Sequence, residues 1–233
     1  FGVDKRFVEI VEDGRTPVAY LFVTRNNGKR TIIYEPNQLP RIELTDEHLA
    51  MLSNAGTVLL DPETTYLAET VKKNAGPRTR IIYDCERWKE GVAQMMELAD
   101  YFIPSAVFLE STPLMDNSLD FFQKVMRLKN DIKGQLIVTR GEEGALYPYN
   151  GNLYRVAPPD VKAIDTIGAG DNFHGAFALA VSLGFDLHRA VRFAVATATL
   201  SCRDYGGRLG LPDRRTALSM TEQINEEIVC PSK

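Results

Sequence analysis

The hydrophobic pattern of the chain changes character near Pro40. Before it, two short period-two segments, Val18–Val23 and Thr31–Tyr34, flank Asn26-Asn27-Gly28-Lys29, a strong tight-turn signal. The pattern predicts an antiparallel β-hairpin over residues 16–34. Both strands carry several large apolar residues, so we expect one face of the hairpin to be covered.

Beyond Pro40, short apolar runs alternate with stretches of helical periodicity. The apolar runs predict four strands, at Val58–Leu60, Ile81–Tyr83, Tyr101–Ile103 and Leu136–Val138. Helices are predicted around them at Thr45–Ser53, Thr64–Asn74, Trp88–Leu98 and Leu119–Lys129. Alternation of this kind favours a mostly parallel sheet with helices on both faces.

The pattern changes again after Thr139. Two apolar segments, Ala145–Tyr149 and Leu153–Val156, are separated by Asn150-Gly151-Asn152 and predict a second hairpin. Two long helices follow, at Ala169–Leu183 and Leu187–Cys202, and a last one is expected from Asp213. With 233 residues, the chain fits a single α/β domain over residues 1–233.

Composition narrows the function classes. Apolar residues make up 44% of the chain, charged residues 25%, and the net charge is -4, so no basic surface for nucleic acid is indicated. No apolar run reaches the length needed to span a bilayer, and no membrane partner is expected. The three cysteines are odd in number and widely spaced, which favours reduced thiols in a cytoplasmic protein.

The stretch Gly168-Ala169-Gly170-Asp171 is the strongest candidate for chemistry. Two glycines permit a tight turn and close approach of a ligand, and the free N–H groups of a following helix would attract an anion. Asp171, in the first turn, could accept a proton from a hydroxyl. The alternative is an ordinary helix start with a capping Asp. Walker and dinucleotide-fingerprint patterns are both incomplete here.

The longer string Asp165–Phe173, which reads Asp-Thr-Ile-Gly-Ala-Gly-Asp-Asn-Phe, resembles the C-terminal signature of the PfkB/ribokinase family of carbohydrate kinases. The resemblance implies a ribokinase-like three-layer α/β/α fold with a small β lid, formed by the first hairpin. It implies transfer of the γ-phosphoryl group of ATP, with Mg²⁺, to a hydroxyl of a sugar or sugar derivative. Asp171 would be the general base, and the amides of Gly168, Ala169 and Gly170 would form the anion hole.

The same resemblance suggests where the nucleotide lies. Val138–Gly144 is similar to the family's strand-end nucleotide loop, so Thr139, Gly141 and Gly144 are candidate ATP-binding residues. Arg140 either reaches a phosphate or is simply solvated. The small-residue segment Ala194–Thr199, with Ala196 at its centre, corresponds to the helix that lines the adenine pocket. Tight helix packing explains that composition equally well.

A monovalent-cation loop is also implied. Gly206 resembles the glycine of the family's potassium loop, whose other side includes Asp165 and Ile167. Because potassium dependence varies within the family, K⁺ is a candidate cofactor beside ATP and Mg²⁺. The predicted lid is in addition a candidate surface for a homodimer.

Two departures from the family pattern stand out. Ser105-Ala106-Val107-Phe108 occupies the place where the family often has Asn-x-x-Glu, a motif linked to magnesium and phosphate handling. Phe1-Gly2-Val3-Asp4 resembles a position well inside the family's chain. We therefore expect the natural protein to include a preceding portion with a central strand and the loop that grips the sugar.

Three readings of the function compete with a sugar kinase. A nucleoside kinase of the same family is not distinguished by the residues named above, because the portion that grips the acceptor is missing. A non-catalytic nucleotide- or sugar-binding protein on this scaffold is favoured slightly by the absent Asn-x-x-Glu and disfavoured by the intact Asp171 and glycines. A dinucleotide-dependent oxidoreductase is disfavoured, because its glycine fingerprint is incomplete and lies far from the start of the chain.

Overall fold

The structure is a computed structural model that describes residues 2–23, 30–35 and 39–230. Its chain divides into two compact units, Phe1–Leu49 and Ala50–Lys233. Each unit is described by itself below.

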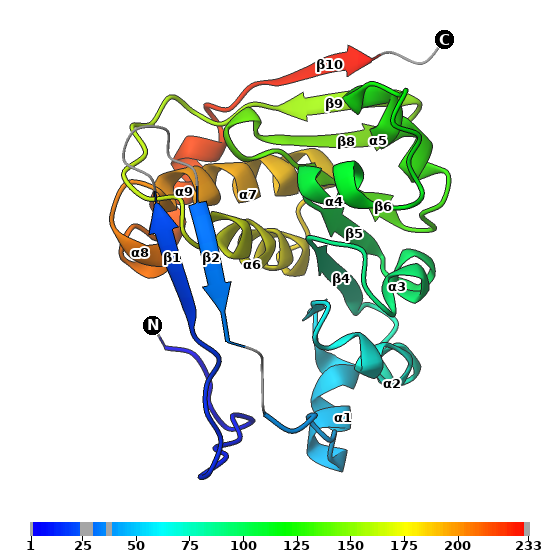
Figure 1. The fold of residues 1–233 in the computed structure, drawn as a ribbon, viewed down its shortest axis with the longest axis vertical. Coiled ribbons are helices and arrows are strands. Elements are labelled where there is room, and N and C mark those ends of the chain that lie inside the picture. The colour runs from blue at the N-terminus through cyan, green and yellow to red at the C-terminus, as the bar shows by residue number, and fades with distance from the viewer. Residues whose placement is uncertain (1, 24–29, 36–38, 231–233) are drawn as a thin grey trace. The chain divides into compact units, whose positions relative to one another are not determined.

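The first unit contains a two-stranded antiparallel sheet. Strand β1, Ala19–Val23, pairs with β2, Arg30–Tyr34, in a register that sets Tyr20 opposite Ile33 (Figure 1). Both of these side chains are more than half exposed, and so is Phe22. The predicted hairpin is therefore present, while its predicted turn, Asn26-Asn27-Gly28-Lys29, lies outside the described residues.

The second unit is built on one long sheet. Four parallel strands come first, in the order β3 (Thr57–Leu60), β4 (Arg80–Cys85), β5 (Tyr101–Pro104) and β6 (Gln135–Leu136). Three antiparallel strands follow on from β7 (Val138–Thr139): β8 (Ala145–Tyr149), β9 (Asn152–Val156) and β10 (Glu226–Cys230).

The parallel and antiparallel parts are continuous through one strand line. The predicted strand Leu136–Val138 is observed as the two short strands β6 and β7, with Ile137 between them. The Ile137 amide donates to the Phe102 carbonyl at 3.0 Å, and Ser105 forms a parallel bridge with Thr139. The hydrogen-bonded pairing along β5 therefore continues from β6 through Ile137 to Thr139 in β7.

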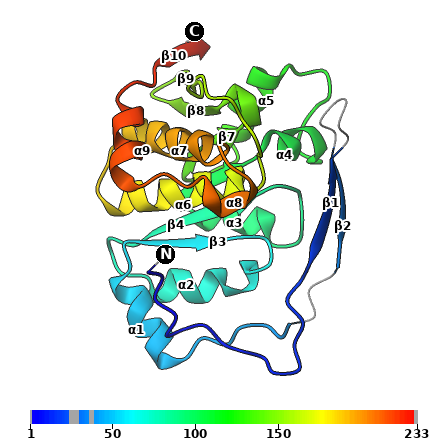
Figure 2. The ribbon, with the colours of Figure 1, turned by 90° about the vertical axis from the view of Figure 1, so that its left-hand side faces the viewer.

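Helices cover both faces of this sheet (Figures 1 and 2). One layer consists of α6 (Ala169–Ser182), α7 (Leu187–Ser201) and α9 (Arg214–Thr221). The other consists of α2 (Ala68–Asn74), α3 (Val92–Leu98), α4 (Ala106–Ser111) and α5 (Phe121–Lys129). The remaining helical pieces are α1 (Asp46–Asn54), α8 (Gly206–Leu209) and two short 3₁₀ turns, η1 (Thr65–Leu67) and η2 (Gly141–Glu143).

Burial on both faces explains why the parallel strands read as continuous apolar runs. Ile81, Ile82 and Tyr83 of β4 are all buried. Successive side chains of a strand point to opposite faces, and Ile82 joins Ile103 and Ile137 in the core under α6 and α7. Its neighbours Ile81 and Tyr83 therefore face the α2–α5 layer. The prediction of a mostly parallel, doubly covered sheet is confirmed.

Local conformations account for shifted or missed boundaries. Helix α3 starts at Val92 and not at Trp88, because Gly91 has a left-handed φ of 85° and interrupts the helical backbone. The β8–β9 turn has positive φ at Asn150 and Gly151, the turn chemistry expected for Asn-Gly in a hairpin. Three elements, α4, α8 and β10, were not predicted. Within the described ranges, none of the helices is both long and apolar enough to cross a membrane.

Candidate active site

The first turn of α6 is held where only glycine fits. Gly168 is the N-terminal capping residue of α6 and has a φ of 73°. A Cβ atom at Gly168 would lie 3.0 Å from the Gly207 Cα atom. Both the left-handed backbone and this close approach exclude a side chain. The predicted motif therefore begins with a glycine that the fold itself requires.

Two loops are tied together beside this turn. The Asp165 carboxylate accepts hydrogen bonds from the amides of Ile167 and Gly206, each at 2.9 Å. The Asn172 side-chain amide donates to the Gly207 carbonyl at 3.1 Å. The three residues predicted for a cation loop, Asp165, Ile167 and Gly206, thus lie in direct contact.

Gly170 and Asp171 face open space. An added Cβ atom at Gly170 would have no neighbour within 4 Å, and the residue is exposed. Asp171 is also exposed, and its Oδ2 atom lies 3.8 Å from the position of a Cβ added to Gly168. The Ala169 amide donates to the Thr166 carbonyl at 3.3 Å. The first-turn amides that follow have no acceptor within the helix, so the helix start can receive an anion.

A buried histidine and a carboxylate lie directly behind this turn, and the sequence reasoning missed them. His174, one turn along α6, has its Nδ1 atom 2.7 Å from the Gly170 carbonyl oxygen and 3.3 Å from Asp84 Oδ2. Asp84 belongs to β4, near its carboxyl end. The signal available in the sequence was the position of Asp84, because the carboxyl ends of parallel strands are where ligands bind in such sheets.

The charges around Asp84 interact strongly. Burial raises the pKa of the Asp84 carboxyl, the neighbouring His174 lowers it, and the carboxylates of Asp171, Asp61 and Glu86 raise it further. Asp61 directly follows β3. Asp171 thus shares one electrostatic environment with groups at the carboxyl ends of β3 and β4.

The predicted nucleotide loop forms a tight turn at the end of β7. Thr139 is the last residue of the strand, and the Arg140 amide donates to the Gly144 carbonyl at 2.7 Å. The Arg140 guanidinium is partly exposed and has two partners in the protein. It lies over the Phe121 ring, 4.0 Å from the ring centre, and forms an ion pair with Glu143 at 2.7 Å.

The two glycines of this loop differ in their surroundings. Gly144 is buried with a φ of 85°, and an added Cβ atom would overlap the Val156 carbonyl oxygen. Gly141 also has a positive φ, 55°, but an added Cβ atom there would meet nothing within 4 Å. Gly144 is therefore required by the approach of β9, whereas the space at Gly141 is open to a ligand.

Ala196 lies in the interior of α7. Its side chain is fully buried and belongs to the core cluster between α7 and the sheet. Ala198 and Thr199 on the same helix are half-buried. The part of α7 that a ligand could touch is therefore next to Ala196 and not Ala196 itself.

The residues in place of the Asn-x-x-Glu motif provide no carboxylate. Ser105 precedes α4, and Phe108 is buried against Phe102 with a ring-centre distance of 5.8 Å. Among the described residues, no cluster of three or more His, Cys, Asp or Glu side chains could hold a metal ion. A magnesium ion here would depend on ligand phosphates and waters, which is a usual arrangement for Mg²⁺.

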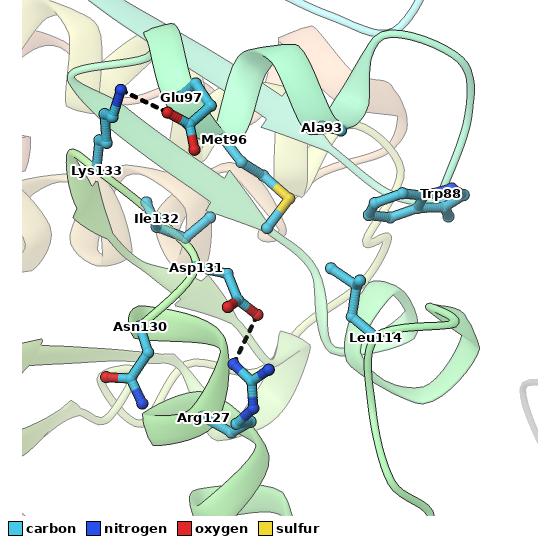
Figure 3. Close-up of a pocket in the computed structure, with 10 residues that line it drawn as sticks. All are labelled: Trp88, Ala93, Met96, Glu97, Leu114, Arg127, Asn130, Asp131, Ile132 and Lys133. Carbon is cyan, nitrogen blue, oxygen red and sulfur yellow. Dashed lines mark hydrogen bonds and ion pairs between the residues drawn. The ribbon is translucent and has the colours of Figure 1, made fainter.

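Two hollows on the second unit contain none of the predicted site residues. One, of about 580 Å³, is lined by Trp88, Met96 and Leu114 and includes the ion pairs Arg127–Asp131 and Lys133–Glu97 (Figure 3). The other, of about 520 Å³, lies near Arg78 and Tyr101. The candidate active site is thus identified by its backbone geometry and by the side chains that meet there, and not by a deep pocket.

Comparison with known proteins identifies the family of the chain. The family model described as pfkB family carbohydrate kinase matches residues 1–214. The chain therefore belongs to the PfkB family, and its fold is ribokinase-like.

Individual relatives are distant. A ribokinase from Lactococcus lactis is 27% identical over 146 residues, which are 63% of this chain and 45% of that protein. A deoxyribokinase from Salmonella typhi is 28% identical over 234 residues, 97% of this chain and 74% of that protein. The structure of Arabidopsis thaliana ribokinase complexed with ribose and ATP is 25% identical, with a TM-score of 0.70, covering 90% of this chain and 70% of that one. The first of these matches spans less than half of the relative's length.

The two loop glycines generate a stability prediction. Gly144→Ala should lower the free energy of unfolding by more than ~3 kcal/mol, because the new methyl group overlaps a carbonyl oxygen in a backbone region closed to alanine. Gly141→Ala should cost only ~1–2 kcal/mol, the strain of a left-handed alanine. Urea unfolding of both variants measures the difference, and equal costs would contradict the assignment.

Proposed function

We propose that this protein is an ATP-dependent carbohydrate kinase that transfers the γ-phosphoryl group to a hydroxyl of a sugar or sugar derivative. Asp171 is the general base. The amides at the start of α6, at Gly168, Ala169 and Gly170, form the anion hole. The proposal extends the family membership to an activity for this particular chain.

One observation carries the proposal: a carboxylate and the open amides of Gly170 and Asp171 share the first turn of α6, next to the Ala169 amide, which already donates to the Thr166 carbonyl at 3.3 Å. Gly170 is exposed with free space where a side chain would be, and Asp171 is the next residue. An anion in that space would meet the positive end of the α6 dipole. A transferred phosphoryl group spreads negative charge over its oxygens, so fixed donors at this point favour its transition state.

The nucleotide would lie between the Thr139–Gly144 loop and α7. Open space at Gly141 and the half-buried Ala198 and Thr199 are the features that support this arrangement. Arg140 contributes through the stiffness of the loop, since its guanidinium is already engaged with Phe121 and Glu143. Mg²⁺ would arrive with ATP and neutralise phosphate charge.

A monovalent cation is a further part of the proposal. The Asp165 carboxylate and the adjoining loop carbonyls could support K⁺ close to the start of α6. Such an ion would add positive potential beside the anion hole. We place the enzyme in the cytoplasm, where thiols such as those of Cys85 and Cys202 stay reduced.

The lid hairpin offers two apolar faces. Tyr20, Phe22 and Ile33 are exposed on one face, and Tyr34 is exposed on the other. We propose that one face covers the substrate and excludes water, and that the other is a surface for a homodimer.

The acceptor is tested by a panel. ADP release by the complete gene product, with Mg²⁺ and K⁺, is measured across sugars, sugar phosphates and nucleosides. A sugar acceptor supports the proposal, and turnover with a nucleoside alone replaces it by the nucleoside kinase. A folded protein that binds ATP without turnover on any acceptor would instead fit a binding protein on this scaffold, which the missing Asn-x-x-Glu carboxylate favours.

Asp171→Asn tests the general base. We expect kcat to fall by about 10²–10⁴, because the amide cannot accept the hydroxyl proton, while the Kd for ATP changes less than about threefold. Steady-state kinetics and calorimetric ATP titration make the two measurements. A kcat close to that of the wild type would show that Asp171 is not the general base.

Gly170→Ala separates ligand binding from folding. Alanine meets no protein atom here and is the better helix former, so the free energy of unfolding should stay equal or rise by up to ~1 kcal/mol. The new methyl group would nevertheless stand where the anion approaches, so kcat/KM should fall at least about tenfold. A variant that is both stable and fully active would argue against the anion hole.

A further inference from the structure

The side chain of His174 is a buried polar group that the mechanism above leaves without a role. Only 5% of the side chain is exposed, although it lies one helical turn from Gly170. Side chains on a helix point back toward its N-terminus, so the His174 ring extends from its own Cα atom toward the first turn of α6. It lies behind the candidate anion hole and not within it.

Three oxygen acceptors lie close to the two ring nitrogens. Nδ1 lies 2.7 Å from the Gly170 carbonyl oxygen and 3.3 Å from Asp84 Oδ2. Nε2 lies 3.3 Å from the Ile103 carbonyl oxygen. A neutral imidazole has one N–H and would turn a lone pair toward an oxygen at its other nitrogen. A doubly protonated ring donates at both positions.

The three acceptors belong to three different elements. Gly170 lies in the first turn of α6, Asp84 in β4 and Ile103 in β5. The ring therefore connects the helix start with the carboxyl ends of two adjacent parallel strands. A small displacement of this turn relative to the sheet would displace the catalytic carboxylate and the amides together.

We propose that His174 is a positioning residue, an imidazolium that fixes the first turn of α6 against β4 and β5 and neutralises Asp84 behind the anion hole. The inference rests on the proposed kinase function and deepens it. Without the imidazolium, the Asp84 carboxylate would face the transferred phosphoryl group unpaired and repel it. The other charged groups near Asp84 are the carboxylates of Asp61, Glu86 and Asp171, and none of them could take over this role.

The kinetic test is a double-mutant cycle in the complete gene product. His174→Gln keeps a polar donor but removes the charge, and should lower kcat about 10- to 100-fold, with the KM for the acceptor nearly unchanged. Adding Asp84→Asn removes the unpaired carboxylate and should restore most of that loss. A role in packing alone predicts that the second substitution leaves or deepens the defect.

A matched control is available in the same chain. His188 is also paired with a carboxylate, Glu226, at 2.9 Å, but it lies at the start of α7 beside Tyr147 and away from the candidate site. His188→Gln should leave kcat within about twofold of the wild type. Thermal unfolding of all variants is measured as well. Unchanged unfolding transitions in the two histidine variants would show that a lower kcat does not come from a loss of folded protein.

A second readout does not depend on activity. Long-range ¹⁵N–¹H spectra of ¹⁵N-histidine-labelled protein should give both ring nitrogens of His174 the shifts of a protonated ring at pH 7, assigned by their disappearance in His174→Gln. A neutral tautomer at pH 7, or an H174Q kcat within twofold of the wild type, overturns the inference. If the His174 ring is protonated but the protein turns over no acceptor, the charged pair of His174 and Asp84 is supported and the proposed kinase function is not.

Discussion

The close contact of Gly168 with Gly207 is the constraint on which the candidate site depends. Two backbones meet at this point so closely that an added Cβ atom would lie 3.0 Å from the Gly207 Cα atom, and the Asp165 carboxylate joins the same loops through two amides. Together these contacts determine where α6 begins. The start of that helix fixes the direction of its amides and the position of Asp171, so the proposed chemistry would depend on this close approach of two backbones.

The opposite side of the same turn is held by the sheet. The parallel strands β4 and β5 end beside α6, and His174 contacts both through Asp84 and the Ile103 carbonyl. The helix start is thus fixed from two directions, by a glycine contact on one side and a polar contact on the other. A rigid site with an open front is the arrangement that preorganised stabilisation of a transferred group needs.

Much of the fold could be predicted because both faces of the sheet are buried. Apolar runs such as Ile81–Tyr83 are strong signals when neither face meets water. The missed elements lack such signals: α4 is too short for periodicity, and β10, Glu226–Cys230, is an edge strand that begins with two glutamates and has only a short apolar run. The motif Asp165–Phe173 was readable because its residues are contiguous. The contact between Asp84 and His174 was not, because only the folded sheet brings two distant residues together.

The glycines of the predicted motifs are present for different physical reasons, which the sequence alone does not distinguish. Gly168 and Gly144 are required by the protein itself, since an added methyl group would meet the backbone of Gly207 or the carbonyl of Val156. An added Cβ atom at Gly170 or at Gly141 would meet no protein atom within 4 Å. The left-handed φ of 55° accounts for glycine at Gly141, whereas Gly170 weakens the start of a helix with no protein atom to explain it, which fits the anion proposed at this position. The anion of the proposed reaction would occupy the space at Gly170, so this empty space is as informative about the site as any of its side chains.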